Sequence, residues 1–546
     1  MKERKKYLDS PGSIWLPVLF AAGLKIILLA TGRIPFNADE AIVALMARHI
    51  NQGNLPIFFY GQSYMGSMDA ILVALGFKAF GEAVSVIRIL QSLLYLGTVY
   101  TTAVLGKIIF KSPRAAVIAG MLAAVPPVNV SLYTTISLGG YGELLFIGNL
   151  LLISGIQITR KVKKEGFIAG TGFHLILLGW GMGAGFAFWV IGLSLVYTIP
   201  AGLFLMWEIW KSERPGKFLL AGFLILSGGL IGAMPWWIFA LINNSTEVFS
   251  ELAGSALSGI SNGTALTQVL QRFGSLFLFG STVLLGLRPP WGVRWLMMPI
   301  LPFILVFWCL VFYSSIKNIA RKKYRNELPL FGLMGVILLA GFILTPYGAD
   351  PSGRYFVPLI LPMVIFGTEF LIKHPKINPK ISLGIVALIL IFNLGGTIQS
   401  ILEYPPGLTS QFDKIAQIDH QKMGELMVFL EKKQITRGYT NYWVSYPLAF
   451  LSNEQLIFVP RLPYHEDFRY TARDDRYPPY DKLVLASKEI GYITTKHPIL
   501  DNYLRQEFKS RGISWEEKQI GDFQIFYELS VLIHPQELGL GTTTIQ

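Results

Sequence analysis

The sequence predicts a polytopic α-helical membrane protein of about 11 transmembrane helices, followed by a small C-terminal α/β domain. Of its 546 residues, 52% are hydrophobic and only 15% are charged, whereas soluble domains carry about a quarter charged residues. The apolar residues are gathered in segments long enough to cross a bilayer, and no such segment follows residue 402. These observations predict that residues 1–403 form a membrane domain and residues 404–546 a second domain.

The expected spans follow from length and hydrophobicity, because a transmembrane helix needs about 20 mostly apolar residues. They are residues 14–31, 84–106, 114–132, 142–159, 166–183, 185–207, 218–242, 295–316, 328–345, 354–372 and 381–402.

The basic residues predict the orientation of these spans. The net charge is +13, and the positive residues cluster at the N-terminus and in short loops such as RKVKK (160–164), KNIARKKYR (317–325) and KHPKINPK (373–380). Loops of this kind stay in the cytoplasm. We therefore expect a multi-pass protein of the cell membrane with a cytoplasmic N-terminus and an extracytoplasmic C-terminal domain. The charge indicates topology in the lipid bilayer and not a face that binds nucleic acid.

Three shorter apolar stretches are too short for ordinary spans. Residues 40–52 and 68–80 are expected to be interfacial helices in the first outer loop. Residues 273–287 are expected to be a re-entrant or surface-lying helix on the outer side. If this last stretch crossed the membrane, the basic loop 317–325 would lie outside, against the rule for positive charges.

The tail changes to a charged composition rich in Tyr and Pro. KMGELMVFLEKK (422–433) has apolar residues at helical spacing, and LIFVP (456–460) and QIFYEL (524–529) are typical of short strands. The run RLPYHEDFRYTARDDRYPPYD (461–481) mixes aromatic residues with both signs of charge. It is expected to be a plain surface loop, with binding of an acceptor or a partner as the alternative.

Two adjacent carboxylates, Asp39 and Glu40, follow the first span and would lie outside the cytoplasm. They could simply favour the positive end of a helix that begins near Ala41. The following loop GNLPIFFYGQSYMGSMDA (53–70) is richer in aromatic and polar residues than a connection requires, which favours a functional site.

Further candidates come from the other outer loops. Within the first loop we expect Tyr60, Gln62, Tyr64 and Asp69 to bind substrate, although Asp69 could instead cap the helix 68–80.

Glu143 would lie at the outer mouth of the fourth span, and Arg354 and Tyr355 at the outer start of the tenth. Glu143 could be an ordinary helix-start acid, and Arg354 could extend its charged end to the membrane interface beside an aromatic-belt Tyr355. Lys25 is expected to extend toward the headgroups.

Carboxylates and an arginine at the outer membrane face suit transfer from a lipid-linked phosphate. A carboxylate can take the proton of an incoming hydroxyl or amine, and an arginine can neutralise charge on a departing phosphate. The sequence has no Gly-rich phosphate loop, which argues against a cytosolic nucleotide-sugar donor. A single cysteine, Cys309, excludes an internal disulfide framework and a Cys-rich metal site.

These residues resemble the GT-C superfamily, and most closely its family 39 group of protein mannosyltransferases and aminoarabinose transferases. The resemblance rests on FNADEA after the first span, the run GQSYMGSMDA, Arg88 in SVIRIL and GRYFVP from Gly353. It covers about residues 10–400 and is best in the first 110.

The resemblance implies transfer of a sugar from a polyprenyl-phosphate donor to a glycan, lipid or protein acceptor outside the cytoplasm, usually with inversion. Asp39 would be the general base, Glu40 would support it or position the acceptor, and Glu143 would be a second catalytic acid. Arg354 would hold the lipid phosphate. Some members need a divalent cation, Mg²⁺ or Mn²⁺, which Asp39 and Glu143 could hold.

The sequence departs from both named groups and leaves alternatives open. Tyr60-Gly61-Gln62-Ser63-Tyr64 stands where aminoarabinose transferases carry a Lys-Pro-Pro-type motif, and the tail is not the repeat domain of eukaryotic protein mannosyltransferases.

A membrane transporter or lipid flippase is the first alternative function. The glycines between Gly179 and Gly185 would fit its broken helices, but they fit a tight outer turn equally well. The other alternative is an assembly protein that binds partners through its tail.

Overall fold

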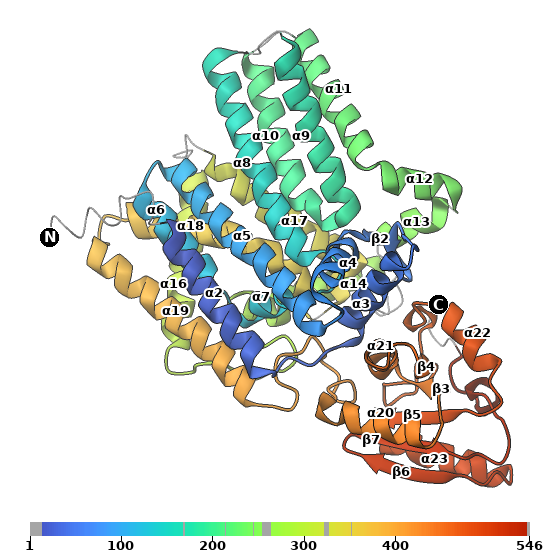
Figure 1. Cartoon of the computed structure of the whole chain (residues 1–546). Coiled ribbons are helices and arrows are strands. Elements are labelled where there is room, and N and C mark those ends of the chain that lie inside the picture. The colour runs from blue at the N-terminus through green and yellow to red at the C-terminus, as the bar shows by residue number, and fades with distance from the viewer. Residues whose placement is uncertain are drawn as a thin grey trace.

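The computed structural model describes residues 14–166, 170–212, 215–243, 245–253, 264–320, 327–350 and 352–542. Figure 1 shows a large helical part, from which α8, α9, α10 and α11 project together, and a smaller part that contains a sheet and ends the chain. The basic N-terminal residues and most of the loop 317–325 lie outside the described residues.

Each of the eleven expected spans falls on a helix. Eight helices of the described residues are long and apolar enough to cross a membrane, and α2, α6 and α17 are shorter apolar helices. The helices are α2 (Trp15–Thr31), α5 (Val84–Phe110), α6 (Pro113–Ala124), α8 (Tyr141–Glu165), α9 (Thr171–Val190), α10 (Leu195–Ser212), α11 (Pro215–Gly232), α16 (Leu301–Ala320), α17 (Leu328–Leu344), α18 (Ile360–Lys373) and α19 (Pro379–Leu402). The expected multi-pass helical membrane protein is therefore confirmed.

Three spans are less regular than their hydrophobicity predicts. The third ends at Ala124 and continues after Pro127 as α7 (Val128–Tyr133), and the seventh continues beyond α11 as α12 (Met234–Ile242). The tenth begins with a 3-10 turn, Arg354–Leu359, before α18. The prolines account for these breaks, since proline lacks a backbone N–H and clashes with the preceding helical turn.

The loop between α2 and α5, which the basic residues predict to be the first outer loop, contains two helices, as expected, but they differ in burial. Helix α4 (Met68–Phe80) exposes Leu75 and Phe80, in keeping with an interfacial helix. Helix α3 (Ala38–Asn51) is buried along nearly its whole length, between α4 and the C-terminal part. Between them, β1 (Phe58–Phe59) and β2 (Gln62–Gly66) form a short antiparallel ladder.

The third short stretch, around residues 273–287, continues a longer helical segment. Helix α14 (Ala265–Ser275) passes into a π-helical turn, Leu276–Gly280, and then into α15 (Ser281–Leu284). Helix α13 (Ser245–Leu252) precedes it in the chain and contacts β2.

The C-terminal part is the expected α/β unit. Its five strands have the order β4-β3-β5-β7-β6, in which β3 pairs in parallel with β4 and β5, and β7 pairs antiparallel with β5 and β6. The predicted helix 422–433 is α20 (Met423–Lys432), and the predicted strands are β4 (Ile457–Pro460) and β7 (Phe523–Tyr527). The remaining elements are β3 (Arg437–Thr440), α21 (Tyr442–Leu451), α22 (Pro479–Leu485), β5 (Gly491–Thr495), α23 (Pro498–Ser510) and β6 (Glu516–Ile520).

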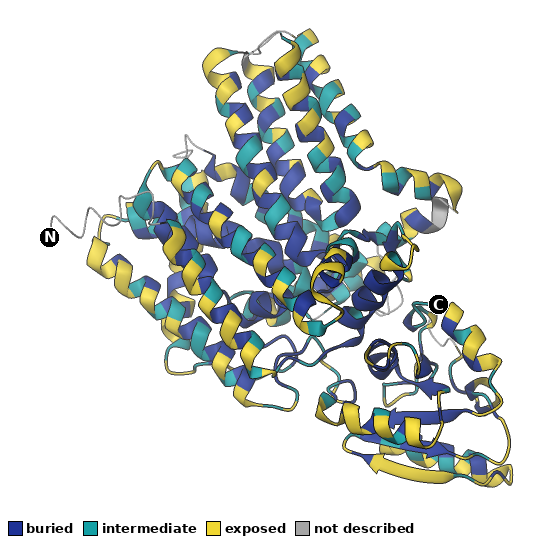
Figure 2. Ribbon diagram, viewed as in Figure 1, coloured by how far each residue is buried: buried dark blue, intermediate teal, exposed yellow. Residues whose placement is uncertain are grey.

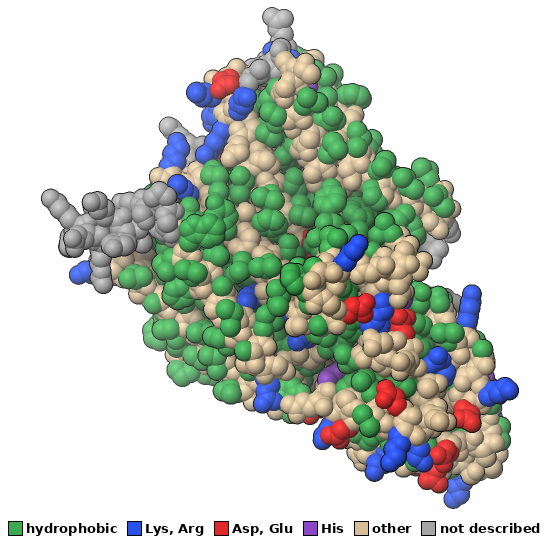
Figure 3. Space-filling model, in the orientation of Figure 1, with side chains coloured by type: hydrophobic (Ala, Val, Ile, Leu, Met, Phe, Trp, Pro, Cys, Tyr) green, Lys and Arg blue, Asp and Glu red, His purple; other side chains and the backbone are tan. Residues whose placement is uncertain are grey.

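The two parts differ in the surface they present. Figure 3 shows hydrophobic side chains over the helical part and mixed acidic and basic side chains over the C-terminal part. Exposed positions in Figure 2 follow the outer faces of α9, α11 and α19, and they include large apolar residues such as Leu226, Leu230 and Leu383. An apolar outer surface on helices of this length is what contact with lipid requires.

Lys25 does not reach the headgroups, contrary to expectation. Its side chain is buried in the helical part, where Nζ donates to the Thr134 carbonyl at 2.7 Å and to the hydroxyls of Thr134 and Thr135 at 2.8 and 2.7 Å. It therefore ties α2 to the end of α7. The threonine oxygens replace water as hydrogen-bond acceptors, so the buried ammonium group does not need the membrane–water interface for solvation.

The glycines after Gly179 neither break a helix nor form a turn, because α9 continues to Val190. Gly181 and Gly185 lie on the face of α9 that packs against α11, whereas Gly183 faces Leu151 of α8. A Cβ atom at Gly185 would lie 2.0 Å from the carbonyl oxygen of Gly229, and one at Gly181 would lie 2.2 Å from that of Ile225. Small residues allow the two backbones to approach closely, as is usual where membrane helices associate.

We expect Gly185→Ala to lower the melting temperature of the purified protein, because the added methyl group would force α9 and α11 apart. Overpacking typically costs about 1–3 kcal/mol. Gly179→Ala is the matched control, since a Cβ at Gly179 meets nothing within 4 Å. Equal melting temperatures for the two variants would contradict the close packing of these helices.

Candidate active site

The start of α3 places Asp39 and Glu40 in different environments. The side chain of Asn37 caps the helix by accepting from the Glu40 backbone N–H at 2.9 Å, so neither acid is the capping residue. Glu40 is fully buried, whereas Asp39 remains partly accessible. Two neighbouring acids in one helical turn therefore have different partners.

Glu40 forms a buried ion pair with Arg88 of α5. The guanidinium donates from Nε to Oε1 at 3.0 Å and from Nη2 to Oε2 at 2.8 Å. Arg88 also donates to the carbonyl oxygens of Ile34 and Pro35 at 3.0 and 3.2 Å. A bidentate pair of this kind fixes orientation as well as charge. Glu40 and Arg88 thus tie the segment that precedes α3 to helix α5.

Asp69 and Glu143 form a second buried group around Gln91 of α5. Gln91 Nε2 donates to Asp69 Oδ1 at 2.8 Å and to Glu143 Oε1 at 3.3 Å. Asp69 Oδ2 accepts from the Ser137 hydroxyl at 2.6 Å and from the backbone N–H groups of Gly139 and Gly140 at 3.2 and 3.3 Å. Asp69 therefore holds the loop before α8. The expectations that it binds substrate or caps α4 do not match this placement.

The expected cation site of Asp39 and Glu143 does not fit this arrangement. Glu143 is buried beside Asp69 and Gln91, and its Oε2 has no hydrogen-bond partner. The described residues hold no group of three or more His, Cys, Asp or Glu side chains placed to bind a metal ion. We derive no catalytic step through a cation.

The C-terminal part supplies the partners of Asp39. The hydroxyl of Tyr442, at the start of α21, donates to Asp39 Oδ1. Arg476 lies against the same tyrosine, 5.6 Å from its ring centre, and has Asp39, Tyr64 and Asp474 as electrostatic neighbours. Two segments about 400 residues away in the chain thus meet the first outer loop at Asp39.

Arg476 is held to the first outer loop itself. It donates from Nη1 to the Gly61 carbonyl at 3.1 Å. With its amide oxygen facing the guanidinium, Gln62 accepts from Nη1 and Nη2 at 2.9 and 2.8 Å. The Nε of Arg476 is buried without a hydrogen-bond partner. Burial raises the pKa of neighbouring Asp474 to about 7, although Arg476 opposes this.

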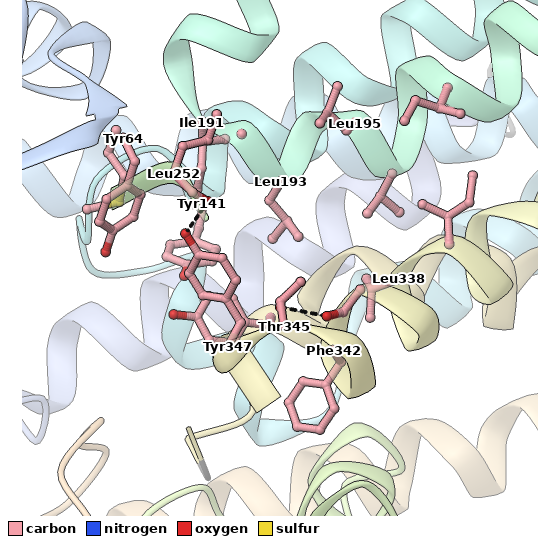
Figure 4. A pocket seen from close by; sticks show the side chains of 17 residues that line it. Tyr64, Tyr141, Ile191, Leu193, Leu195, Leu252, Leu338, Phe342, Thr345 and Tyr347 are labelled. Carbon is pink, nitrogen blue, oxygen red and sulfur yellow. Dashed lines mark hydrogen bonds between the residues drawn. The ribbon is translucent and has the colours of Figure 1, made fainter. Parts of the chain in front are cut away.

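Tyr64 connects this charged group to a cavity. Its electrostatic neighbours are Arg354, Arg476, Asp39 and Glu251. The cavity is about 300 Å³ in volume and lies between α10 and α17. It is lined by Tyr64, Met65, Tyr141, Ile191, Gly192, Leu193, Leu195, Val196, Ile199, Leu252, Ile337, Leu338, Gly341, Phe342, Thr345, Tyr347 and Tyr355. Figure 4 shows tyrosines at one end of the cavity and leucines toward the other.

Tyr355 lines the tyrosine end of the cavity, and Arg354 lies beside it. Arg354 Nε lies 2.7 Å from Asp350 Oδ2, and its guanidinium lies 5.0 Å from the ring centre of Tyr355. The Tyr355 ring is 5.1 Å from that of Tyr347. The arginine side chain is 31% exposed, so it is accessible to an anion.

Tyr60 belongs to a contact between α3 and the C-terminal part. Its hydroxyl lies 2.8 Å from His49 Nδ1, and its ring stacks on that of Tyr477 at 4.9 Å. His49 Nε2 lies 3.1 Å from Glu454, which also accepts from the Tyr480 hydroxyl at 2.6 Å. Tyr60 thus joins the two parts, and the structure does not place it at the cavity.

Tyr442, Asp474 and Arg476 were not among the site residues predicted from the sequence. The last two belong to the run 461–481, for which a plain surface loop was expected. That expectation was wrong, because the run reaches Gln62 and Asp39. Its combination of tyrosines with both signs of charge was the available signal, but no local pattern specifies which distant loop such a segment contacts.

Solved structures share this fold. ArnT from Cupriavidus metallidurans bound to undecaprenyl phosphate matches with a TM-score of 0.56 and 11% sequence identity, over 96% of this chain and 100% of that one. The same protein in the apo state matches with a TM-score of 0.56 and 12% identity, over 95% and 98%. The Archaeoglobus fulgidus oligosaccharyltransferase in the apo form has a TM-score of 0.48 and 10% identity, over 89% of this chain and 69% of that one.

No protein-family model and no curated protein sequence matches the chain. The likeness to ArnT extends over nearly the whole chain and confirms the expected GT-C-like fold. The protein is thus a multi-pass membrane protein of this fold with a C-terminal α/β unit that contacts the loop between α2 and α5.

We expect Glu40→Gln to destabilise the protein by about 3 kcal/mol, because it leaves the buried charge of Arg88 without its anion. Thermal unfolding of the purified variant measures this loss. Glu528→Gln, which removes an exposed partner of Lys433, is the control and should leave the melting temperature unchanged. A stable Glu40→Gln protein without activity would instead indicate that Glu40 acts on a substrate.

The stability that the contact at Glu454 contributes should depend on pH. Burial alone would raise the pKa of Glu454, but the hydrogen bonds from His49 and Tyr480 outweigh it and lower the pKa to about 2, from an ordinary 4.5. A carboxyl group whose pKa is lowered by folding stabilises the folded state in full when the pH is above its ordinary pKa. This stabilisation is lost as the pH falls toward 2.

The difference in unfolding free energy between the wild type and Glu454→Gln should therefore shrink from pH 4.5 to pH 2. Thermal unfolding across this range measures it. A difference that stays constant over the range would show that the carboxylate does not stabilise the contact with α3.

Proposed function

We propose that this protein is a membrane glycosyltransferase that moves a sugar from a polyprenyl-phosphate donor to an acceptor outside the cytoplasm. The observation that carries the proposal is the convergence of Asp39, Arg354 and Arg476 on Tyr64, at the polar end of an apolar cavity. An amphiphilic donor needs both features, since its chain is apolar and its reacting end is charged. Support also comes from the similar fold of ArnT, a protein with a structure bound to undecaprenyl phosphate.

Asp39 is the general base of the proposed reaction. Its Oδ1 is occupied by the Tyr442 hydroxyl, which orients the carboxylate, and Oδ2 would take the proton of the acceptor hydroxyl or amine. The acceptor oxygen or nitrogen bonds to the anomeric carbon as the bond from that carbon to the phosphate oxygen breaks. The electron pair leaves with the phosphate, and attack in line with the leaving group inverts the anomeric centre.

Arg354 is the residue that we assign to the departing phosphate. Its guanidinium is partly exposed and lies beside Tyr355 at the tyrosine end of the cavity. A guanidinium there would neutralise the charge that grows on the phosphate as the bond breaks. The Leu and Ile side chains of α10 and α17 would hold the first isoprene units of the carrier.

The C-terminal part completes the proposed site from the acceptor side. Tyr442 and Arg476 reach Asp39, whereas Arg354 and the cavity belong to the helical part. We propose that residues 1–403 form the transmembrane catalytic domain and residues 404–546 an extracytoplasmic domain that contacts the acceptor. This orientation keeps the N-terminus cytoplasmic, as the basic loops predict.

The test uses the purified full chain in nanodiscs, with a panel of polyprenyl-phosphate sugars and a membrane extract as the acceptor source. Release of free polyprenyl phosphate is measured. We expect release by the wild type and at least a 100-fold slower rate for Asp39→Asn, since a general base contributes about 10²–10⁴-fold.

Asp467→Asn, an exposed acid of the C-terminal part, is the matched control and should retain the wild-type rate. Arg354→Gln should weaken donor use while the protein remains folded. If Asp39→Asn releases the carrier as fast as the wild type does, the assignment of the base is wrong. If the wild type releases no carrier from any donor, the proposed reaction is wrong.

A further inference from the structure

A second and larger cavity lies at the other end of the same helix pair. It has a volume of about 510 Å³ and is bordered by α8, α10 and α17. Its lining residues are Lys163, Pro200, Leu203, Phe204, Trp207, Glu208, Lys211, Pro329, Leu330 and Leu333. On α10 the first cavity ends at Ile199 and the second extends from Pro200 to Lys211, and on α17 they use Ile337–Phe342 and Pro329–Leu333, so the two cavities lie toward opposite ends of this helix pair.

The lining changes character in a fixed order along α10. Leu203 and Phe204 come first, one turn later follows Trp207, and Lys211 ends the series. The Lys211 ammonium lies 4.8 Å from the Trp207 ring centre, and 51% of the Trp207 side chain is exposed. Tryptophan is typical of the membrane–water interface, with apolar residues below it and lysine above it. This order matches the parts of a phospholipid: acyl chain, glycerol region and phosphate.

The charge at this end of the molecule favours an anion. The cavity has two lysines, Lys163 and Lys211, against one carboxylate, Glu208. Lys161 and Lys164, both exposed, lie on the same end of α8. Figure 3 shows Lys and Arg side chains gathered over the projecting end of the helical part.

We propose that this cavity binds one anionic phospholipid from the leaflet opposite the candidate active site. Its phosphate would lie between Lys163 and Lys211, its glycerol region beside Trp207, and one acyl chain against Leu203, Phe204 and Leu333. Basic pockets between membrane helices on the cytoplasmic side are suited to anionic headgroups. The bound lipid would brace α8 against α10 and α17, the two helices that border the first cavity.

The other candidate occupant is the far end of a long carrier chain that runs along α10 and α17 from the first cavity. A hydrocarbon end has no group for Lys163 or Lys211 to pair with. The charge of the cavity therefore favours the phospholipid, and competition between the two lipids distinguishes them.

The test is the binding of phosphatidylglycerol to the delipidated full-length protein in detergent, with phosphatidylcholine as the neutral comparison. Native mass spectrometry counts the bound lipid, and the melting temperature reports its effect. We expect one phosphatidylglycerol to be retained in preference to phosphatidylcholine and to raise the melting temperature. Lys163→Gln/Lys211→Gln should weaken phosphatidylglycerol binding by tenfold or more, as the loss of two lysines near a lipid phosphate predicts.

Lys161→Gln is the matched control, because Lys161 is exposed on the same helix but does not line the cavity. It should bind phosphatidylglycerol as the wild type does. Leu333→Trp should exclude both phospholipids by filling the acyl-chain site. The proposal is overturned if the double variant retains full affinity, if Lys161→Gln loses as much as the double variant, or if saturating polyprenyl phosphate displaces the phosphatidylglycerol.

Discussion

The ion pair between Glu40 and Arg88 is the interaction on which the candidate site depends. It fixes the first turn of α3 to α5, and the same arginine holds the chain before α3 through two carbonyl oxygens. Asp39 is the preceding residue in the chain, so its position follows from this anchor. Because the pair is buried and bidentate, rotation of the helix start would leave a charge without a partner, at a cost of several kcal/mol.

The C-terminal part packs on the anchored helix α3 and completes the candidate site. It covers α3 with α21 and places Tyr442 and Arg476 beside Asp39. A separate contact, in which Glu454 meets Arg48 and His49, holds the two parts together away from the site. The two parts are thus joined both beside Asp39, through Tyr442 and Arg476, and at this separate contact.

Several features were predictable from the sequence because they depend on local chemistry. Each of the eleven predicted hydrophobic segments lies on helix in the described residues, and short apolar and aromatic runs predicted the strands β4 and β7. The polar loop after α2 supplies Asp39 and Tyr64, and Arg354 is an electrostatic neighbour of Tyr64, while the roles assigned to these residues stay predictions. Predictions failed where a distant partner decides the outcome. Lys25 was expected at the headgroups but finds acceptors on α7, and Asp69 was expected to bind substrate but holds the loop before α8.

The sequence by itself determined a helical membrane protein with a C-terminal α/β unit and a cluster of acids after its first span. These properties follow from hydrophobicity, periodicity and charge, which act over a few turns of chain. Only the tertiary structure decided that Glu40 is buried against Arg88 while Asp39 stays accessible, and that Tyr442 and Arg476 reach it. Neighbouring carboxylates are chemically alike until burial and long-range partners make them differ, and these depend on how segments about 400 residues apart pack together.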